Sequence, residues 1–311
     1  MKVKSMSYSW VVEGSILPCP RHGLGIVFPF LTTVEINVRT LRFYKVSPGG
    51  NATILILDPV PSLKRAEVSR LLMDAGHLQA EQVGFLDLQS QPVRLDMMGG
   101  EFCGNACRAA AAVMARERVG LVPEGAELRG ELSVSGAKMP VQLKVAADGE
   151  FWVEMPMPET AAQGANGITE LEPGIGLVRL PGITHLCLDE ERHPFAEDFA
   201  SAAAALRTRF GLDGDAVGCI WYKASPVCAI KPVVWVRSTA STHFETGCGS
   251  GSLALALWLT RGQNFPTDLK VLQPSGSQIG VRLRADGPTA WIFGPVTLVA
   301  RGEAFLISSS E

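Results

Sequence analysis

The sequence predicts two similar α/β domains, because it contains an internal repeat, short strands alternate with helices, and its composition can fill two cores. The chain has 311 residues, of which 47% are hydrophobic and 19% charged. At roughly 100–200 residues per domain, this length suggests about two domains. The hydrophobic share is too high for an intrinsically disordered chain. The 32 glycines and 20 prolines favour many short strands joined by tight turns.

Four short motifs of the first half recur in the second half, in the same order and about 140 residues later, which indicates an internal duplication. A repeating unit of this length is a domain and not a solenoid repeat. The motif pairs are Cys103 and Cys248, Ser135-Gly136 and Ser275-Gly276, Val141-Gln-Leu and Val281-Arg-Leu, and Ala147-Asp-Gly and Ala285-Asp-Gly.

Hydrophobic periodicity predicts the same kinds of element in both halves. In the first half the helices are 63–75, with Ser62 as N-cap, and 103–118; the strands are 41–46, 52–57, 82–88, 93–97, 131–135, 141–145 and 151–154. In the second half the helices are 197–209 and 248–260; the strands are 183–188, 217–222, 233–237, 269–273, 281–284 and 291–293. Asp148-Gly149 and Asp286-Gly287 predict hairpin turns before the last strand of each half.

The repeat also sets the predicted domain boundaries. The first domain is expected to cover residues 39–157, and the second residues 158–296. A strand at about 297–307 lies beyond the second repeat, and we expect residues 297–311 to return to the first domain. Residues 1–38 are an N-terminal extension, either outside the main fold or the product of a start assigned too far upstream.

Charge and hydropathy exclude several classes of partner. Lys and Arg number 28 and Asp and Glu 31, for a net charge of −3, which argues against nucleic acid or an anionic membrane as partner. No apolar run reaches the ~18–20 residues that cross a bilayer. The segment Ser5–Gly14 is too polar for the apolar core of a signal peptide. We therefore expect a cytoplasmic protein that binds a small molecule.

The chain contains seven cysteines, an odd number, with no CxxC pair and no zinc-type spacing of Cys and His. This favours reduced thiols in a cytosolic protein, and no metal site. Two of the thiols stand out, because Cys103 and Cys248 occupy the same place in each repeat. Each follows a glycine-containing loop and begins an apolar helix. The other cysteines that we interpret as core residues are Cys107, Cys187, Cys219 and Cys228.

A thiol at a helix N-terminus lies at the positive end of the helix dipole, so we expect a lowered pKa and raised reactivity at Cys103 and Cys248. Free N–H groups at the same place can hold a carboxylate. Two thiols converging on one such site suit racemisation of an amino acid, in which a base removes the α-proton from one face and an acid returns a proton to the other. This chemistry requires no cofactor. A nucleotide site is the weaker interpretation, because Gly247–Ser252 lacks the lysine and spacing of the phosphate-binding motifs.

The two cysteine motifs, Cys103-Gly-Asn and Cys248-Gly-Ser-Gly, resemble those of the cofactor-independent amino-acid racemases and epimerases, over residues 39–311. The resemblance implies two pseudo-symmetric α/β domains, each a curved mixed sheet around a central helix. Within this superfamily, the chain most resembles the histidine racemases of staphylopine-type opine metallophore biosynthesis. The supporting strings begin at Ser47, Glu81, Gly100 and Gln273.

Diaminopimelate epimerases, in the same superfamily, hold the distal end of their substrate with a Glu-Arg pair and asparagines. Here the pair would fall near Thr239-Ala240, which carries neither charge, and the Asn-Pro-His segment reads Ile183-Thr-His185. The strand Gly218–Tyr222 lacks the corresponding asparagine. These departures imply a neutral or aromatic substrate side chain, so we expect histidine, with diaminopimelate or another amino acid as the alternative.

The resemblance assigns roles to nine residues. The acid/base pair is Cys103 and Cys248, and the α-carboxylate is held by backbone N–H groups of Gly104, Asn105, Gly249 and Ser250. Two further residues, Asn51 and Gln82, lie near the substrate, and Glu245 holds the α-ammonium or an imidazole. A helix-dipole partner is an alternative role for Glu245. Glu81, His185 and His243 remain weaker candidates, with structural roles as the alternative.

Two rival functions remain at this point. The chain could be a non-catalytic amino-acid-binding relative, although a binder does not require the thiol pair. It could also be an isomerase of the phenazine-biosynthesis type, which normally lacks that pair. A free amino acid is the expected partner, and the only protein partner that we expect is a second copy of the chain.

Overall fold

The structure is a computed structural model and describes residues 5–10, 34–157, 167–237, 240–261, 267–284 and 289–308. By their internal contacts the residues form two units, Met1–Arg42 with Glu303–Glu311, and Phe43–Gly302. The first unit contains β1, whose residues pair antiparallel with the beginning of β2. Residues 158–166 lie outside the described part, and the predicted domain boundary at 157 stays a prediction.

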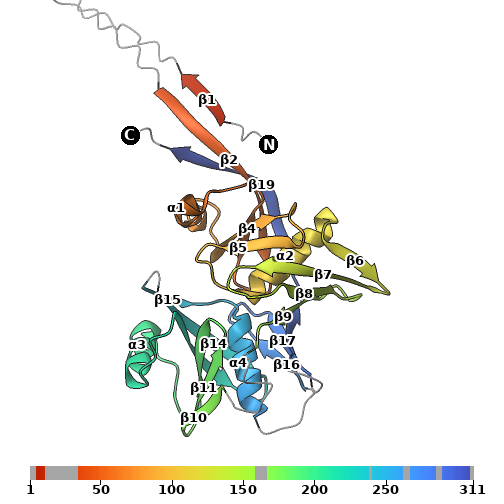
Figure 1. Cartoon of the computed structure of the whole chain (residues 1–311). Coiled ribbons are helices and arrows are strands. Elements are labelled where there is room, and N and C mark those ends of the chain that lie inside the picture. The colour runs from red at the N-terminus through yellow and green to blue at the C-terminus, as the bar shows by residue number, and fades with distance from the viewer. Residues whose placement is uncertain are drawn as a thin grey trace, which may run out of the picture. The chain divides into compact units, whose positions relative to one another are not determined.

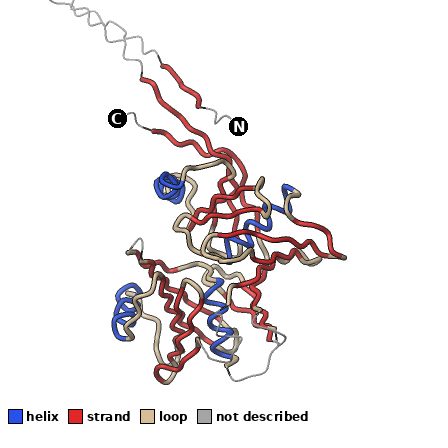
Figure 2. Tube along the Cα trace, in the orientation of Figure 1, coloured by secondary structure: helices blue, strands red, loops and turns tan. Residues whose placement is uncertain are grey.

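Figure 1 shows the helices and strands with their labels, and Figure 2 shows the same trace coloured by secondary structure. The helices are α1 (Ser62–Met73), α2 (Gly104–Glu117), α3 (Phe199–Arg209) and α4 (Gly249–Leu259). The strands up to the middle of the chain are β1 (Ser5–Trp10), β2 (Val34–Ser47), β3 (Thr53–Ile56), β4 (Gln82–Asp87), β5 (Val93–Met97), β6 (Leu121–Glu124), β7 (Glu127–Val134), β8 (Val141–Val145) and β9 (Phe151–Met155). The later strands are β10 (Ile168–Glu172), β11 (Ile175–Leu180), β12 (Ile183–Asp189), β13 (Ala216–Lys223), β14 (Ala229–Val236), β15 (Ser241–Phe244), β16 (Thr267–Leu272), β17 (Gln278–Leu283), β18 (Ala290–Gly294) and β19 (Thr297–Ser308).

The strand pairing repeats between the halves. In the first half β3 is antiparallel to β2 and parallel to β4, β5 is antiparallel to β4 and parallel to β7, and β7, β8 and β9 form an antiparallel run. In the second half β12 is antiparallel to β11 and parallel to β13, β14 is antiparallel to β13 and parallel to β16, and β16, β17 and β18 form an antiparallel run. The predicted pseudo-symmetric mixed α/β fold is therefore present.

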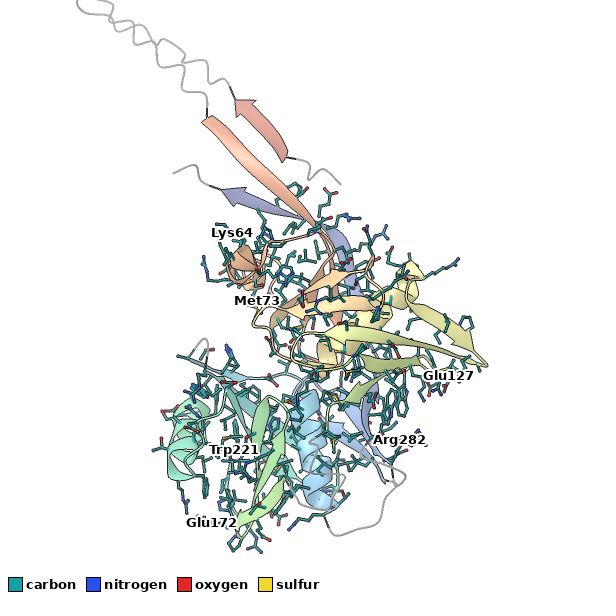
Figure 3. The ribbon with its side chains drawn as sticks, in the orientation of Figure 1. Lys64, Met73, Glu127, Glu172, Trp221 and Arg282 are labelled. Carbon is teal, nitrogen blue, oxygen red and sulfur yellow. The ribbon has the colours of Figure 1, made fainter. Side chains whose placement is uncertain are left out.

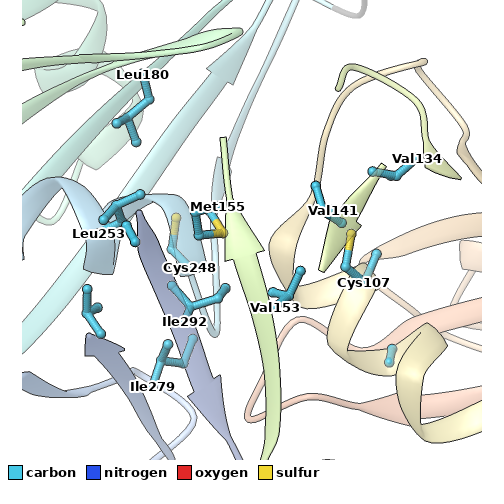
Figure 4. Packing of buried hydrophobic residues seen from close by; sticks show 14 of the residues in the cluster. Cys107, Val134, Val141, Val153, Met155, Leu180, Cys248, Leu253, Ile279 and Ile292 are labelled. Carbon is cyan, nitrogen blue, oxygen red and sulfur yellow. The ribbon is translucent and has the colours of Figure 1, made fainter. Parts of the chain in front are cut away.

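Each half packs its sheet against one buried helix. In α2 every residue from Gly104 to Met114 is buried, because the run of small alanines lets strands approach closely from several sides. In α4 most residues are buried likewise. Both helices belong to one continuous hydrophobic cluster, part of which Figure 4 shows around Met155, Ile292 and Cys248. The predicted central helices thus occupy the cores, and their first turns lie where the two halves meet.

The last strands of the two repeats join the halves. Strand β9 pairs antiparallel with β18, with Val153 opposite Ile292 and Phe151 opposite Gly294. Trp152 and Phe293 stack face to face beside this pair, with ring centroids 3.8 Å apart. The sheet therefore runs from one half into the other through backbone hydrogen bonds.

The outer helix α3 covers the opposite face of the second sheet. Ala203 of α3 lies in a separate hydrophobic cluster with Leu186 and Trp221, and Trp221, labelled in Figure 3, meets Phe195 edge to face. Alternate residues of β12 and β13 therefore face α3 and α4. This alternation fixes which strand side chains reach the interior around α4.

Several predicted details differ from the structure. Helix α1 begins at Ser62 itself, after Pro61 and without a side-chain cap, so the predicted Ser62 N-cap is wrong. The sequence does not predict the strands β1, β6, β10, β11 and β15. The turn at Asp286-Gly287 and residue Thr239 lie outside the described residues. In the described part of the chain, no helix is both long and apolar enough to span a membrane.

Candidate active site

The two repeated cysteines stand at equivalent positions of the backbone. Cys103 is the N-cap of α2, with φ −134° and ψ 109°, and Cys248 is the N-cap of α4, with φ −125° and ψ 105°. Their sulfur atoms accept the N–H groups of Ala106 and Gly251, at 3.5 and 3.3 Å. Each thiol thus takes the place that a serine or threonine hydroxyl usually has at a helix start.

The two helix starts face each other across one side chain. A Cβ atom on Gly104 would lie 2.7 Å from Cδ1 of Ile292, and a Cβ on Gly249 would lie 2.6 Å from the same atom. Asn105 extends across the gap, and its Nδ2 donates to the carbonyl oxygen of Gly247 at 3.0 Å. The glycines therefore permit a close approach that any side chain would prevent. The first N–H groups of both helices, which have no partner within a helix, converge here.

A loop of the first half packs against loops of the second half at the same place. The Asn51 N–H donates to Oγ1 of Thr246 at 2.8 Å, and Oγ of Ser275 donates to the carbonyl of Gly49 at 2.9 Å. Glu81 accepts from Thr246 twice, from N–H at 3.2 Å and from the hydroxyl at 2.5 Å. Asn51 is buried with φ 54°, in the left-handed region that asparagine tolerates.

Cys103 has an amide partner in its own half. Its thiol donates to Oε1 of Gln82 at 3.2 Å, and Nε2 of Gln82 donates to Oγ1 of Thr53 at 2.7 Å, which fixes the orientation of the amide. The Cys103 side chain is half-buried. Burial raises the pKa of the Cys103 thiol to about 11, although the Ala106 N–H acts in the opposite direction.

Cys248 is more deeply enclosed, with 3% of its surface exposed. Its N–H donates to Oε1 of Gln273 at 2.9 Å, and Nε2 of Gln273 is held by Oγ of Ser252 at 3.0 Å. Oγ of Ser250 lies 3.6 Å from the sulfur. Burial raises the pKa of the Cys248 thiol well above its ordinary value, and the negative charge of Glu245 adds to the effect.

Glu245 lies beside both thiols. Its charge raises the pKa of Cys103 as well as that of Cys248. Burial raises the pKa of Glu245 itself to about 7. The expected lowering of the thiol pKa values is therefore wrong. The free energy needed to remove a thiolate from water exceeds the stabilisation that a hydrogen bond from a helix N–H group provides.

The structure thus gathers every predicted site residue around the two helix starts. Asn51, Gln82, Gly104 and Asn105 come from the first half, and Glu245, Gly249 and Ser250 from the second. Sequence reasoning missed Thr246 and Gln273. The string that begins at Gln273 is part of the family resemblance. The hydrogen bond between Gln273 and Cys248, however, joins residues 25 positions apart and leaves no local signal in the sequence.

Among the other candidates, His243 is exposed and its ring bonds to Ser241, whereas His185 is fully buried on β12. Over the described ranges, no three His, Cys, Asp or Glu side chains are grouped so that they could hold a metal ion. The groups that the described residues bring to this place are two thiols, the carboxyls of Glu245 and Glu81, amide groups and backbone N–H groups.

Comparison with known proteins gives this arrangement a family. The family model described as "Histidine racemase CntK N-terminal domain" matches residues 40–305. The chain belongs to this histidine racemase family. A histidine racemase of Fusobacterium nucleatum is 30% identical over 278 residues, which cover 87% of this chain and 99% of the relative. The histidine racemase of Staphylococcus aureus is 24% identical over 283 residues, 87% of this chain and 100% of that relative.

Solved structures show the same fold at lower identity. A hydroxyproline epimerase from Agrobacterium vitis, with bound trans-4-hydroxy-L-proline, has a TM-score of 0.59 and 14% identity, over 86% of this chain and 93% of the epimerase. A phenazine biosynthesis protein of the PhzF family from Enterococcus faecalis has a TM-score of 0.57 and 19% identity, over 86% of this chain and all of that chain. These likenesses establish the fold of this histidine racemase family member.

Proposed function

We propose that this protein is a cofactor-independent racemase of free histidine, with Cys103 and Cys248 as its acid/base pair. The observation that carries the proposal is the equivalent N-cap placement of the two thiols, at helix starts whose first glycines, Gly104 and Gly249, both lie against Ile292. The relatives named as histidine racemases support histidine as the substrate. We place the reaction in the cytoplasm, where thiols remain reduced.

In the proposed reaction, the thiolate of one cysteine takes the α-proton and becomes a thiol. The thiol of the other cysteine then donates its proton to the opposite face of the α-carbon and becomes a thiolate. The configuration inverts, and proton exchange with solvent resets the pair. Backbone N–H groups of Gly104, Asn105, Gly249 and Ser250 hold the α-carboxylate and stabilise the charge that develops on it.

The substrate itself eases the formation of the thiolate. Both thiol pKa values are raised in the closed site, so a thiolate is costly there. The α-ammonium group of an amino acid brings a positive charge beside the thiols and Glu245, which lowers that cost. Asn51 and Gln82, both buried in the same region, would orient the substrate. Enclosure of Cys248 keeps water from the carbanion-like intermediate.

The first test is proton NMR in D₂O with a reductant, in which purified protein meets single L-amino acids. We expect loss of the α-proton signal of L-histidine with appearance of the D-isomer. Loss with diaminopimelate and not with histidine would overturn the proposed substrate. No exchange with any amino acid would overturn the racemase assignment and favour a binding function.

A further inference from the structure

His185 is buried without a hydrogen bond. It lies on β12 with 0% of its surface exposed, and within the described residues neither Nδ1 nor Nε2 has a hydrogen-bond partner. Buried polar groups are nearly always paired, because an unpaired group forfeits its interaction with water and gains nothing. Two unpaired nitrogens on one ring therefore indicate a polar group that the described residues do not supply.

The ring of His185 lies on the face of the sheet that covers α4. A Cβ atom on Gly218, the neighbour of His185 on β13, would lie 2.2 Å from Nδ1 of His185. Further along β13, Ile220 and Tyr222 belong to the same cluster as α4, whereas Trp221 faces α3. Because strand side chains alternate, Gly218 faces α4 as well, and the imidazole above it does too.

Contacts along β13 show which end of α4 the ring approaches. Tyr222 accepts a hydrogen bond from Nε1 of Trp258, near the end of α4, at 3.1 Å. Ile220, two residues before Tyr222 on β13, has its Cδ1 atom 2.7 Å from the Cβ position of Gly251 in the first turn of α4. Gly218 lies two residues before Ile220, so Gly218 and its neighbour His185 lie at the N-terminal end of α4.

That end of α4 carries the Cys248 thiol. The Cβ position of Gly251 that lies 2.7 Å from Cδ1 of Ile220 lies 3.0 Å from Sγ of Cys248, so Ile220, two residues along β13 from Gly218, reaches the helix turn that carries the thiol. Oδ1 of Asn105 is a second buried polar atom at the helix starts without a partner among the described residues. Unmet hydrogen-bonding groups thus gather where the substrate is proposed to bind.

Burial also fixes the charge of the ring. It lowers the pKa of His185 to about 3, so the imidazole stays neutral at physiological pH. A neutral imidazole offers one N–H donor and one nitrogen acceptor. It suits a neutral group with the same two functions and gives no ionic compensation to a carboxylate.

We propose that His185 determines substrate specificity by hydrogen-bonding the substrate side chain at the N-terminal end of α4. It selects a neutral ring with a donor and an acceptor, such as an imidazole, over an apolar ring or a distal carboxylate. This inference rests on the proposed function, because it assigns a residue to the side-chain end of the same site.

The test compares L-histidine with L-2-thienylalanine, a ring of similar shape without a nitrogen donor or acceptor, in the wild type and in variants. For His185→Leu we expect kcat/KM for histidine to fall about 10- to 100-fold, mainly through KM, with little change for thienylalanine. His185→Gln, which keeps a donor and an acceptor, should recover part of the loss. Cys187→Ala is the matched control, because Cys187 is equally buried two residues further along the same face. It should leave the substrate ratio unchanged.

A folded His185→Leu with an unchanged ratio of the two substrates would overturn the inference. If that variant does not fold, the inference is overturned by an unchanged ratio of the two substrates in His185→Gln together with unmoved ring-nitrogen resonances of His185 in the wild type. NMR of the ring nitrogens follows His185 in the labelled wild-type protein, assigned by the missing signal in His185→Gln. We expect its resonances to shift on saturation with L-histidine, and unmoved resonances would overturn the inference. If the wild type binds histidine and shifts these resonances without exchanging any α-proton, the proposed function fails and the inference stands.

Discussion

The starts of α2 and α4 are copies of one another in backbone but not in surroundings. Each has a cysteine at its N-cap, with φ and ψ within about 10° of its counterpart and a thiol that accepts an N–H three residues later. Cys103, however, is half-buried and contacts the neutral amide of Gln82, whereas Cys248 is enclosed beside the carboxyl of Glu245. The duplicated backbone therefore gives the two thiols the equivalent positions that the proposed acid/base pair requires, and the side chains around them make the two thiols unequal.

The largest effect should come from removing either member of the pair. We expect Cys103→Ser and Cys248→Ser each to lower the rate of histidine racemisation by about 10³-fold or more, because a hydroxyl is a far weaker acid than a thiol. Measurement of D-histidine formation by chiral chromatography checks this. Cys107→Ser, on the same helix but in the core, serves as the control for a lost thiol. Full activity in either active-site variant would refute the two-base mechanism.

The inequality of the thiols can be measured directly by alkylation. In the ligand-free protein we expect iodoacetamide to modify Cys103 at least about ten times faster than Cys248, because Cys103 is the more exposed of the two thiols. Peptide mass mapping over time gives both rates in one sample. Equal rates would show that the sites open together and that the difference in burial does not control reactivity.

A third experiment removes the negative charge of Glu245, which acts on both thiols. Above pH 7 the Glu245 carboxylate raises both thiol pKa values, so Glu245→Gln should speed alkylation of both cysteines several-fold at pH 8. The gain should vanish near pH 5, where Glu245 is protonated in the wild type. Glu101→Gln is the matched control, because it removes another carboxylate whose charge raises the pKa of Cys103. A gain at Cys103 alone in Glu245→Gln would contradict the placement of Glu245 beside both thiols.

The same carboxyl makes a prediction for stability. The pKa of Glu245 is about 7 in the folded protein against an ordinary 4.5, so folding favours its protonated form. Its contribution is fully present below pH 4.5 and is lost as the pH rises through 7. The free energy of unfolding in urea should therefore decline over this window in the wild type and decline less in Glu245→Gln. Identical slopes would show that Glu245 titrates normally.

The smallest expected effect concerns the second residue of each helix. Asn105 donates to Gly247 across the halves, whereas its counterpart Ser250 only approaches the neighbouring thiol. We expect Asn105→Ala to lower the free energy of unfolding by about 1–2 kcal/mol, and Ser250→Ala by about 0.5 kcal/mol or less. Urea denaturation of both variants tests the difference. Equal losses would mean that the bond across the halves adds no stability.

What the sequence predicts well is local or repeated. Helices α2 and α4 were placed within one residue at each end, because a glycine loop, a cysteine and a run of small apolar residues form a local signal. The equivalent placement of the two thiols at helix N-caps follows from the repeat. One such cysteine without its counterpart would be interpreted as a core residue.

What failed depends on contacts between distant residues. The bonds from Thr246 to Glu81 and from Cys248 to Gln273 join separate segments that no short-range pattern relates. The predicted direction of the thiol pKa shifts is wrong for the same reason, because the burial that raises these pKa values comes from the packing of distant segments around the site. Strands β10 and β11 were missed in a segment whose burial pattern gives little alternation.

The join between β9 and β18 has a consequence for how the two halves can diverge. Both strands have five residues, and they pair antiparallel along their whole length with their middle residues, Val153 and Ile292, opposite each other. This is the isologous geometry of a symmetric dimer, here within a single polypeptide. In a true homodimer any acidic residue beside one thiol would appear beside both. Fusion removes that constraint, so this chain carries Glu245 before one cysteine and Gly100 at the equivalent place before the other.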